Sequence, residues 1–259
     1  LLKTFYKKKL NFIFGNALGI SALTNSFLQW SLKKINRGKS DSDYILPMCF
    51  DGQDDHIKEK ISKNSINFYK KYNLKKENII ISYVGNIGYQ SEFDTIIKAA
   101  SILEKQQENI IFVFSGTGPL LNKIKCQSSD LKNVRFTGWL DGIELMQLLQ
   151  ISSFGLIIYK NEMNYIYNIP NKFPEYLSFG NAIICSTSGE MSKLVEKYKI
   201  GFTFQSSNHK DLIIKLNKFL KKKDNHKNAV SSAKKLHKEF FLSSVNYPKY
   251  CDFIEGLLN

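Results

Sequence analysis

The segment at residues 169–185 brings together residue types that could bind a phosphate-bearing ligand. Its proline, Pro170, favours an extended approach, and Asn171 can then cap a helix by accepting a hydrogen bond from an amide of the first turn. Lys172 and Glu175 are three residues apart, so they would share one face at the positive end of that helix. A cation with free amides can hold a diphosphate, and a carboxylate one turn later can accept from two ribose hydroxyls. The spacing therefore predicts a binding site for a nucleotide-sugar.

The same lysine and glutamate have a simpler interpretation. On an isolated helix, Lys172 and Glu175 would form a solvent-exposed ion pair, which contributes little to stability. The surrounding sequence favours the functional interpretation, because Gly180 is a suitable helix stop and Ala182–Cys185 is typical of a short buried strand. The pair would then lie near the edge at which a parallel sheet binds its ligand.

Short apolar runs alternate with amphipathic stretches over most of the chain. The predicted strands lie at 78–84, 110–114, 134–136, 154–158, 182–185 and 201–204. The predicted helices lie at 57–72, 92–105, 142–150 and 190–198, with three more between 211 and 258 that break near 225 and 241–243. Strands that alternate regularly with helices predict an α/β fold. We expect a Rossmann-like parallel sheet with helices on both faces and a ligand crevice at the carboxyl ends of the strands.

Glycine-containing loops follow three of these strands. Glycines at such positions let the backbone approach a ligand and leave amides free, although a tight turn explains the second loop and packing alone explains the aromatic residue of the third. The spacing differs from the dinucleotide fingerprint and from the Walker motif, which argues against NAD and ATP. The candidates are Gly85, Asn86 and Gly88 after the first strand, Gly116 and Gly118 after the second, and Trp139 with Leu140, which could flank a flat base, after the third.

The chain is strongly basic, with a net charge of +14. Among its 37 basic residues only Arg37 and Arg135 are arginines, whereas base reading in nucleic acids relies on arginine forks. We therefore expect no nucleic-acid partner. The lysines concentrate at 3–9, 33–39 and 218–227, which fits a solvated surface or contact with an anionic membrane.

Other catalytic chemistries have little support in the sequence. The four cysteines lack metal-like spacing, which predicts free thiols in a reducing cytoplasm. No Ser-His-Asp order, HExxH or CxxC motif is present, so acyl transfer and zinc chemistry are disfavoured. No apolar run of about 18 residues predicts a transmembrane helix. The histidines lie in polar or lysine-rich stretches away from the strand ends, and we expect surface positions for His56, His209, His226 and His237.

In this order and spacing the loops resemble the donor-binding half of the retaining GT-B glycosyltransferases of the family 4 type. The resemblance is carried by the strings at 85–88, 112–118, 170–177 and 188–190, and it covers about residues 44–220. It is strongest to bacterial members that build lipopolysaccharide, O-antigen or capsule sugars from UDP-activated N-acetylated donors. It implies transfer of a sugar from a UDP-sugar to a glycan or lipid-linked acceptor, in the cytoplasm or at the inner face of the cytoplasmic membrane, without a cofactor or metal.

The resemblance also implies roles for the candidate residues. Lys172 and Asn171 would bind the donor diphosphate and Glu175 the ribose hydroxyls, so that Lys172 and Glu175 carry the catalytic role. The amides of Gly85–Gly88 would face the phosphates or the sugar, with the second glycine loop beside them. Trp139–Leu140 would border the uracil.

Three positions depart from the pattern of the family. Many members carry an arginine at the position of Asn86 and a lysine at that of Ser91, and both of these grip phosphate. Here both positions are neutral, so Lys172 would bear that role alone. A glutamate that is common eight residues before Glu175 is replaced by Tyr167, which weakens an assignment of contacts to the sugar ring.

The resemblance implies a division of the chain into three parts. Residues 1–50 would be the end of an N-terminal acceptor domain, most of which is absent from this chain that begins at Leu1, together with a linker. Residues 51–240 would be the donor-binding domain, and 241–259 a helix that crosses back with its apolar face partly uncovered. Two other functions stay open: a non-catalytic nucleotide-sugar-binding module, and an enzyme of the UDP-N-acetylglucosamine 2-epimerase type, which the scarcity of histidines at strand ends disfavours.

Overall fold

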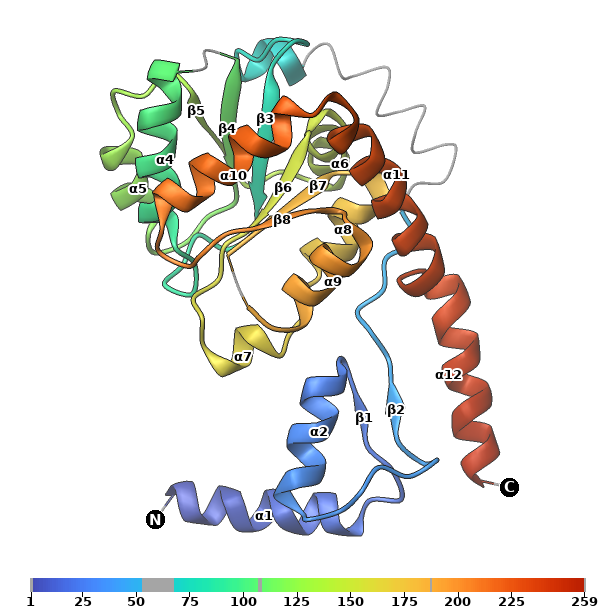
Figure 1. Ribbon diagram of the computed structural model, residues 1–259. Coiled ribbons are helices and arrows are strands. Elements are labelled where there is room, and N and C mark those ends of the chain that lie inside the picture. The colour runs from blue at the N-terminus through green and yellow to red at the C-terminus, as the bar shows by residue number, and fades with distance from the viewer. Residues whose placement is uncertain (1, 53–67, 107–108, 187, 259) are drawn as a thin grey trace.

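A six-stranded parallel sheet forms the centre of the protein (Figure 1). The computed structural model describes residues 2–52, 68–106, 109–186 and 188–258. The strands of the sheet are β3 (Ile79–Val84), β4 (Ile110–Ser115), β5 (Val134–Gly138), β6 (Phe154–Ile157), β7 (Ala182–Cys185) and β8 (Gly201–Thr203). Every neighbouring pair is parallel, which confirms the predicted sheet.

Helices cover both faces of this sheet, as the alternation of strands and helices predicts. One face packs against α4 (Phe93–Gln106) and α10 (His209–Lys221), and the other against α6 (Gly142–Ile151) and α8 (Lys172–Phe179). The remaining helices of this part are α5 (Leu121–Gln127), α7 (Met163–Ile166), α9 (Glu190–Tyr198) and α11 (Lys223–Phe240). Every residue of β4 is buried, because side chains of both faces enter the core.

The order of the strands determines where a ligand can bind. Across the sheet the order is β5-β4-β3-β6-β7-β8, so the chain winds outward from β3 in one direction and then returns to add β6 on its other side. Helix α4, between β3 and β4, and helix α8, between β6 and β7, therefore lie on opposite faces of the sheet. Ligands of doubly wound folds bind outside the carboxyl ends of such a pair of strands.

The first fifty residues form a smaller unit. It contains α1 (Leu2–Asn16), α2 (Asn25–Lys34) and two short parallel strands, β1 (Ser21–Ala22) and β2 (Tyr44–Ile45). A core of Ile20, Leu28 and Leu32 packs within this unit.

The C-terminal helix α12 (Ser243–Leu258) runs alongside this smaller unit (Figure 1). The rings of Tyr250 and Phe253 lie 5.3 and 4.6 Å from that of Tyr44, measured between centroids. The Tyr250 hydroxyl lies 2.9 Å from that of Ser21. Leu258 is 79% exposed, so part of the apolar face of the helix is uncovered. The division into residues 1–50, 51–240 and 241–259 stays a prediction.

Several local expectations differ from the structure. The break between the first two tail helices lies at Lys222 rather than near 225. Most of the helix predicted at 57–72 lies outside the described residues, of which 68–71 are helical. None of the four cysteines forms a disulfide bond. Within the described ranges, no helix combines the length and apolar character needed to cross a membrane.

Candidate functional site

The three glycine-containing loops meet at the carboxyl ends of β3, β4 and β5. They enclose a cavity of about 340 Å³ whose lining includes residues of all three loops: Gly85, Asn86, Gly116, Thr117, Trp139 and Leu140. Trp139 is 74% exposed, so its indole is available to a ligand, whereas Leu140 is buried. Loops that are distant in the sequence are thus brought together at one edge of the sheet.

The loop amides are less available than the sequence suggested. The Gly85 amide donates to the Ser115 carbonyl at 3.0 Å, and the Gly116 amide donates to the Gly138 carbonyl at 2.8 Å. The Ile87 amide donates to the Thr117 carbonyl at 2.8 Å. The expectation that glycines leave the amides free is therefore wrong for these positions, because neighbouring loops occupy them.

Two amides of the first loop have no hydrogen-bond partner in the described part of the chain: that of Asn86, which is exposed, and that of Gly88, which is buried. The hydroxyl of Tyr83 donates to the Asn86 carbonyl at 2.7 Å and holds this loop in place. An anion bound by the backbone of this loop would therefore meet the exposed amide of Asn86.

The second loop packs tightly against the first. A Cβ atom on Gly116 would lie 2.0 Å from the carbonyl oxygen of Gly85, and one on Gly118 would lie 2.5 Å from that of Ile87. Both glycines have positive φ, at 128° and 151°. Close packing of a tight turn is sufficient to explain these two glycines.

A single tyrosine positions α8 at the point where β3 and β6 separate. These strands pair only at two positions, the last being Ser82 with Gly155. Beyond this pair, the Tyr176 hydroxyl takes the place of a partner strand for β3. It donates to the Ser82 carbonyl at 2.9 Å and accepts from the Val84 amide at 3.0 Å. A Cβ on Gly155 would lie 2.3 Å from the Tyr176 ring, so this strand position requires glycine. The first turn of α8 is thereby held beside the end of β3.

Lys172, in the first turn of α8, is only 8% exposed. Its Nζ lies 4.0 Å from the ring centroid of Tyr83 and 5.2 Å from that of Tyr159, which are cation–π contacts. A Cβ on Gly85 would lie 3.2 Å from the same nitrogen, so the ammonium group is directly beneath the first loop. No residue in the described ranges accepts a hydrogen bond from it.

Burial dominates the electrostatics of this lysine. It lowers the pKa of Lys172 from 10.5 to about 7, while the nearby Glu175 carboxylate partly opposes the change. Burial also raises the pKa of Glu175, and Lys172 opposes that rise. A buried ammonium without a hydrogen-bond partner is costly, so this position would gain free energy from an incoming anion.

The expected helix cap by Asn171 is wrong. Its φ and ψ of −50° and −39° are helical, and its side chain accepts no hydrogen bond from the first turn. The turn begins one residue earlier, since the Phe173 amide donates to the Pro170 carbonyl at 2.9 Å. A capping residue needs an extended conformation, which Asn171 does not have. The predicted stop at Gly180 is confirmed, with φ at 79°.

The sequence analysis missed three tyrosines that shape the site. Tyr83 and Tyr159 form the slot that holds Lys172, and Tyr176 anchors its helix. The signal for Tyr83 and Tyr159 was an aromatic residue at or just beyond the end of a strand, but only the strand order brings these two together. Ser91, at a position where phosphate contact was considered, is instead buried beside the Tyr83 hydroxyl at 3.2 Å.

One histidine is buried, contrary to its expected surface position. His237 is 4% exposed, and its Nε2 lies 2.6 Å from the Phe50 carbonyl. His226 is half-buried and contacts the Ser153 carbonyl at the opposite, amino-terminal end of β6. His56 lies outside the described residues. His226 and His237 therefore lie away from the crevice.

Sequence comparison identifies one family. The profile of the family described as "Glycosyl transferases group 1" matches residues 64–236, more than half of the chain. A search of curated proteins found no match.

Several solved structures share the fold at low sequence identity. A glycosyltransferase from Rickettsia africae ESF-5 has 15% identity and a TM-score of 0.77, over 98% of this chain and 67% of that chain. Anabaena Alr3699/HepE in complex with UDP has 14% identity and a TM-score of 0.73, over 99% and 70%. WaaG, a glycosyltransferase involved in lipopolysaccharide biosynthesis, has 16% identity and a TM-score of 0.68, over 88% and 60%. The fold is GT-B, with the six-stranded sheet as its Rossmann-like C-terminal domain.

Proposed function

The chain belongs to the group 1 glycosyltransferases, and from this premise we propose that it transfers a sugar from a UDP-sugar to a glycan or lipid-linked acceptor with retention at the anomeric carbon. In this proposal the donor carries an N-acetylated hexosamine and the product enters a cell-surface polysaccharide. Transfer takes place in the cytoplasm, at the inner face of the membrane. The Anabaena structure, which holds UDP, supports the choice of nucleotide.

One observation carries the proposal: the Lys172 ammonium lies buried at the strand switch point with no hydrogen-bond acceptor among the described residues. As the glycosidic bond of a UDP-sugar breaks, negative charge grows on the departing diphosphate. Lys172 and the positive end of α8 are positioned to stabilise this charge, and a charge-assisted contact of this kind contributes about 1.5–3 kcal/mol. Stabilisation that increases as the charge develops accelerates the reaction.

The other candidate residues have supporting roles in this proposal. The amide of Asn86 binds diphosphate oxygens. Asn171, at the start of α8, also contacts the diphosphate. The half-buried Glu175 carboxylate accepts from the ribose hydroxyls. Trp139 and Leu140, which line the adjoining cavity, border the uracil.

We further propose that transfer needs neither a metal nor a cofactor, since Lys172 supplies the positive charge that a divalent cation would otherwise bring to the diphosphate. No group of three potential metal ligands occurs among the described residues. Transfer should therefore persist in EDTA at the same rate. A rate that depends on added magnesium would contradict this part of the proposal.

Two observations bear on the alternatives. Asn86 is neutral and Ser91 is buried, which favours a non-catalytic nucleotide-sugar-binding module. The positions of His226 and His237 far from the crevice disfavour an epimerase of the 2-epimerase type.

Transfer assays with UDP-N-acetylglucosamine, UDP-glucose and GDP-mannose test the proposed function. We expect turnover with the uridine donors, and an axial anomeric bond in the product by proton NMR when the donor bond is axial. UDP binding without turnover would instead identify a binding module. An equatorial product bond would refute retention.

A further inference from the structure

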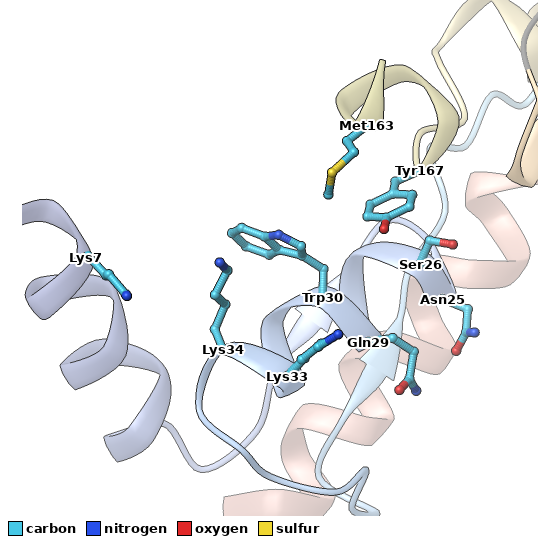
Figure 2. Close-up of a pocket in the computed structure, with 9 residues that line it drawn as sticks. All are labelled: Lys7, Asn25, Ser26, Gln29, Trp30, Lys33, Lys34, Met163 and Tyr167. Atoms are coloured by element: carbon cyan, nitrogen blue, oxygen red, sulfur yellow. The ribbon is translucent and has the colours of Figure 1, made fainter. Parts of the chain in front are cut away.

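A second cavity, of about 580 Å³, lies between the N-terminal helices and α7 (Figure 2). Lys7 of α1 contributes to one wall, α2 contributes Trp30, Lys33 and Lys34, and Met163 and Tyr167 come from α7 and the residue after it. None of these residues lines the cavity at the ends of β3, β4 and β5. The proposed donor site therefore leaves this cavity unexplained.

Hydrogen bonds hold the two walls of this cavity together. The Thr24 hydroxyl donates to the Tyr167 carbonyl at 2.6 Å, and the same oxygen accepts from the Phe27 amide at 3.2 Å as the cap of α2. The Ser26 hydroxyl donates to the Glu190 carboxylate at the start of α9. These contacts join the N-terminal unit to the large sheet, so the cavity is a defined feature of the fold.

The cavity is positively charged and has an aromatic wall. Lys7, Lys33 and Lys34 line it, no carboxylate does, and within the described ranges none of the three forms an ion pair. The Lys34 Nζ lies 5.3 Å from the Trp30 ring centroid. Figure 2 shows the indole between the lysines and Met163. An indole face suits the apolar face of a sugar ring, and uncompensated lysines suit a phosphate.

A short path of contacts connects this cavity to the donor site. The ring of Tyr165, in α7, stacks on that of Tyr159 with centroids 5.0 Å apart and planes 8° apart. Tyr159 in turn contacts the Lys172 ammonium. Tyr167, whose carbonyl anchors α2, precedes Lys172 by only five residues. A ligand in the second cavity would therefore lie along the same segment as the donor diphosphate.

We propose that this cavity binds the acceptor and selects one whose sugar carries a phosphate group. The inference rests on the proposed function. In the step it serves, an acceptor hydroxyl oxygen forms the bond to the anomeric carbon and the bond from that carbon to the diphosphate breaks. UDP keeps the bonding electrons, and the hydroxyl proton passes to the diphosphate. The phosphate belongs either to a free sugar phosphate or to a lipid-diphosphate sugar.

The two tryptophans of the chain allow the two sites to be measured separately, because Trp30 lines this cavity and Trp139 the other. In a Trp139→Phe variant, fluorescence reports on Trp30 alone. With UDP saturating the donor site, we expect glucose 1-phosphate to change this fluorescence saturably, and the neutral octyl glucoside to bind at least about tenfold more weakly. Equal affinity for the two ligands, or no response, would overturn the proposal.

Paired lysine variants test the charge requirement. The Lys33→Gln/Lys34→Gln variant should weaken glucose 1-phosphate binding by about tenfold or more, with octyl glucoside changed less than about twofold. The control Lys8→Gln/Lys39→Gln removes the same charge from exposed positions outside the cavity and should have little effect. Equal weakening by both pairs would mean general electrostatic attraction and would refute a specific site. Should the first pair fail to fold, Lys7→Gln tests the same requirement from α1.

The source of the phosphate is distinguished by a further ligand, N-acetylglucosamine linked through diphosphate to a short polyprenyl chain. If this ligand binds more tightly than glucose 1-phosphate, the acceptor is lipid-linked; if glucose 1-phosphate binds more tightly, the acceptor is soluble. Either result agrees with the proposal. Binding to anionic phosphatidylglycerol vesicles with no response to either sugar would overturn it in favour of membrane contact. Failure of the donor-site proposal would be detected separately, because UDP binding is measured through the fluorescence of Trp139 in a Trp30→Phe variant.

Discussion

Binding of a UDP-sugar should be coupled to uptake of a proton by Lys172. Its pKa is about 7 in the free protein, and a bound diphosphate beside the ammonium should return it toward the ordinary 10.5. Below pH 7 the lysine is already charged in both states, so affinity should not change with pH. Above pH 7 the free lysine loses its proton while the bound one keeps it, and affinity must fall as the pH rises.

The size of the effect follows from these two values. Between pH 6 and 8.5 the dissociation constant should rise about thirtyfold, or about 2 kcal/mol. At pH 8 about nine-tenths of a proton should be taken up per ligand bound. UDP-glucose is the suitable ligand, because its diphosphate, unlike that of UDP, has no terminal phosphate that titrates in this range.

Calorimetry in buffers of different ionisation enthalpy measures the proton uptake directly. The Lys172→Met variant keeps the length of the side chain without its charge, and it should bind UDP-glucose more weakly with no uptake. The control is Lys105→Met, which removes an exposed lysine at the end of α4 and should behave as the native protein. Affinity that is constant from pH 6 to 8.5, or an unchanged uptake in Lys172→Met, would refute the role of Lys172.

Stability without ligand should depend on pH through the same lysine. The pKa of Lys172 is lower in the folded protein than in the unfolded chain, so the unfolded chain binds more protons between pH 7 and 10.5. The free energy of unfolding should therefore rise with pH in this window, by about 1.6 kcal/mol between pH 7 and 8.5. Urea denaturation of the native protein and of Lys172→Met should diverge by this amount. Parallel curves would contradict the buried position of the ammonium.

Three further substitutions test the site and its support. Glu175→Ala should weaken binding of UDP more than that of inorganic pyrophosphate, and equal losses by calorimetry would exclude a ribose contact. Gly155→Ala places a methyl group against the Tyr176 ring and should lower the free energy of unfolding by about 1–3 kcal/mol; an unchanged urea midpoint would show that the helix can move away. Tyr176→Phe leaves the Ser82 carbonyl and the Val84 amide without their partner, at a cost of about 1–3 kcal/mol in the same assay, and a neutral effect would mean that water replaces the hydroxyl.

Sequence alone was sufficient to predict the strands of the large sheet and most of the helices between them, because their signals are local. The alternation of apolar residues identified the strands of the large sheet, and Gly180 marked the end of α8. The three-residue spacing of Lys172 and Glu175 determined that they share a helix face, since helical geometry does not depend on the rest of the fold. The parallel sheet with helices on both faces followed from the order of strands and helices.

The tertiary structure decided which groups are available for chemistry. Burial depresses the pKa of Lys172. Two of the residues around its ammonium, Tyr83 and Tyr159, lie 89 and 13 residues away in the chain and meet only where two strands separate. The amide of Gly85 donates to the last residue of β4, Ser115, although the sequence of its own loop suggested a free donor. Burial and hydrogen bonding are properties of the whole packed chain, so a local pattern could name the lysine, but only the packing determined its charge state.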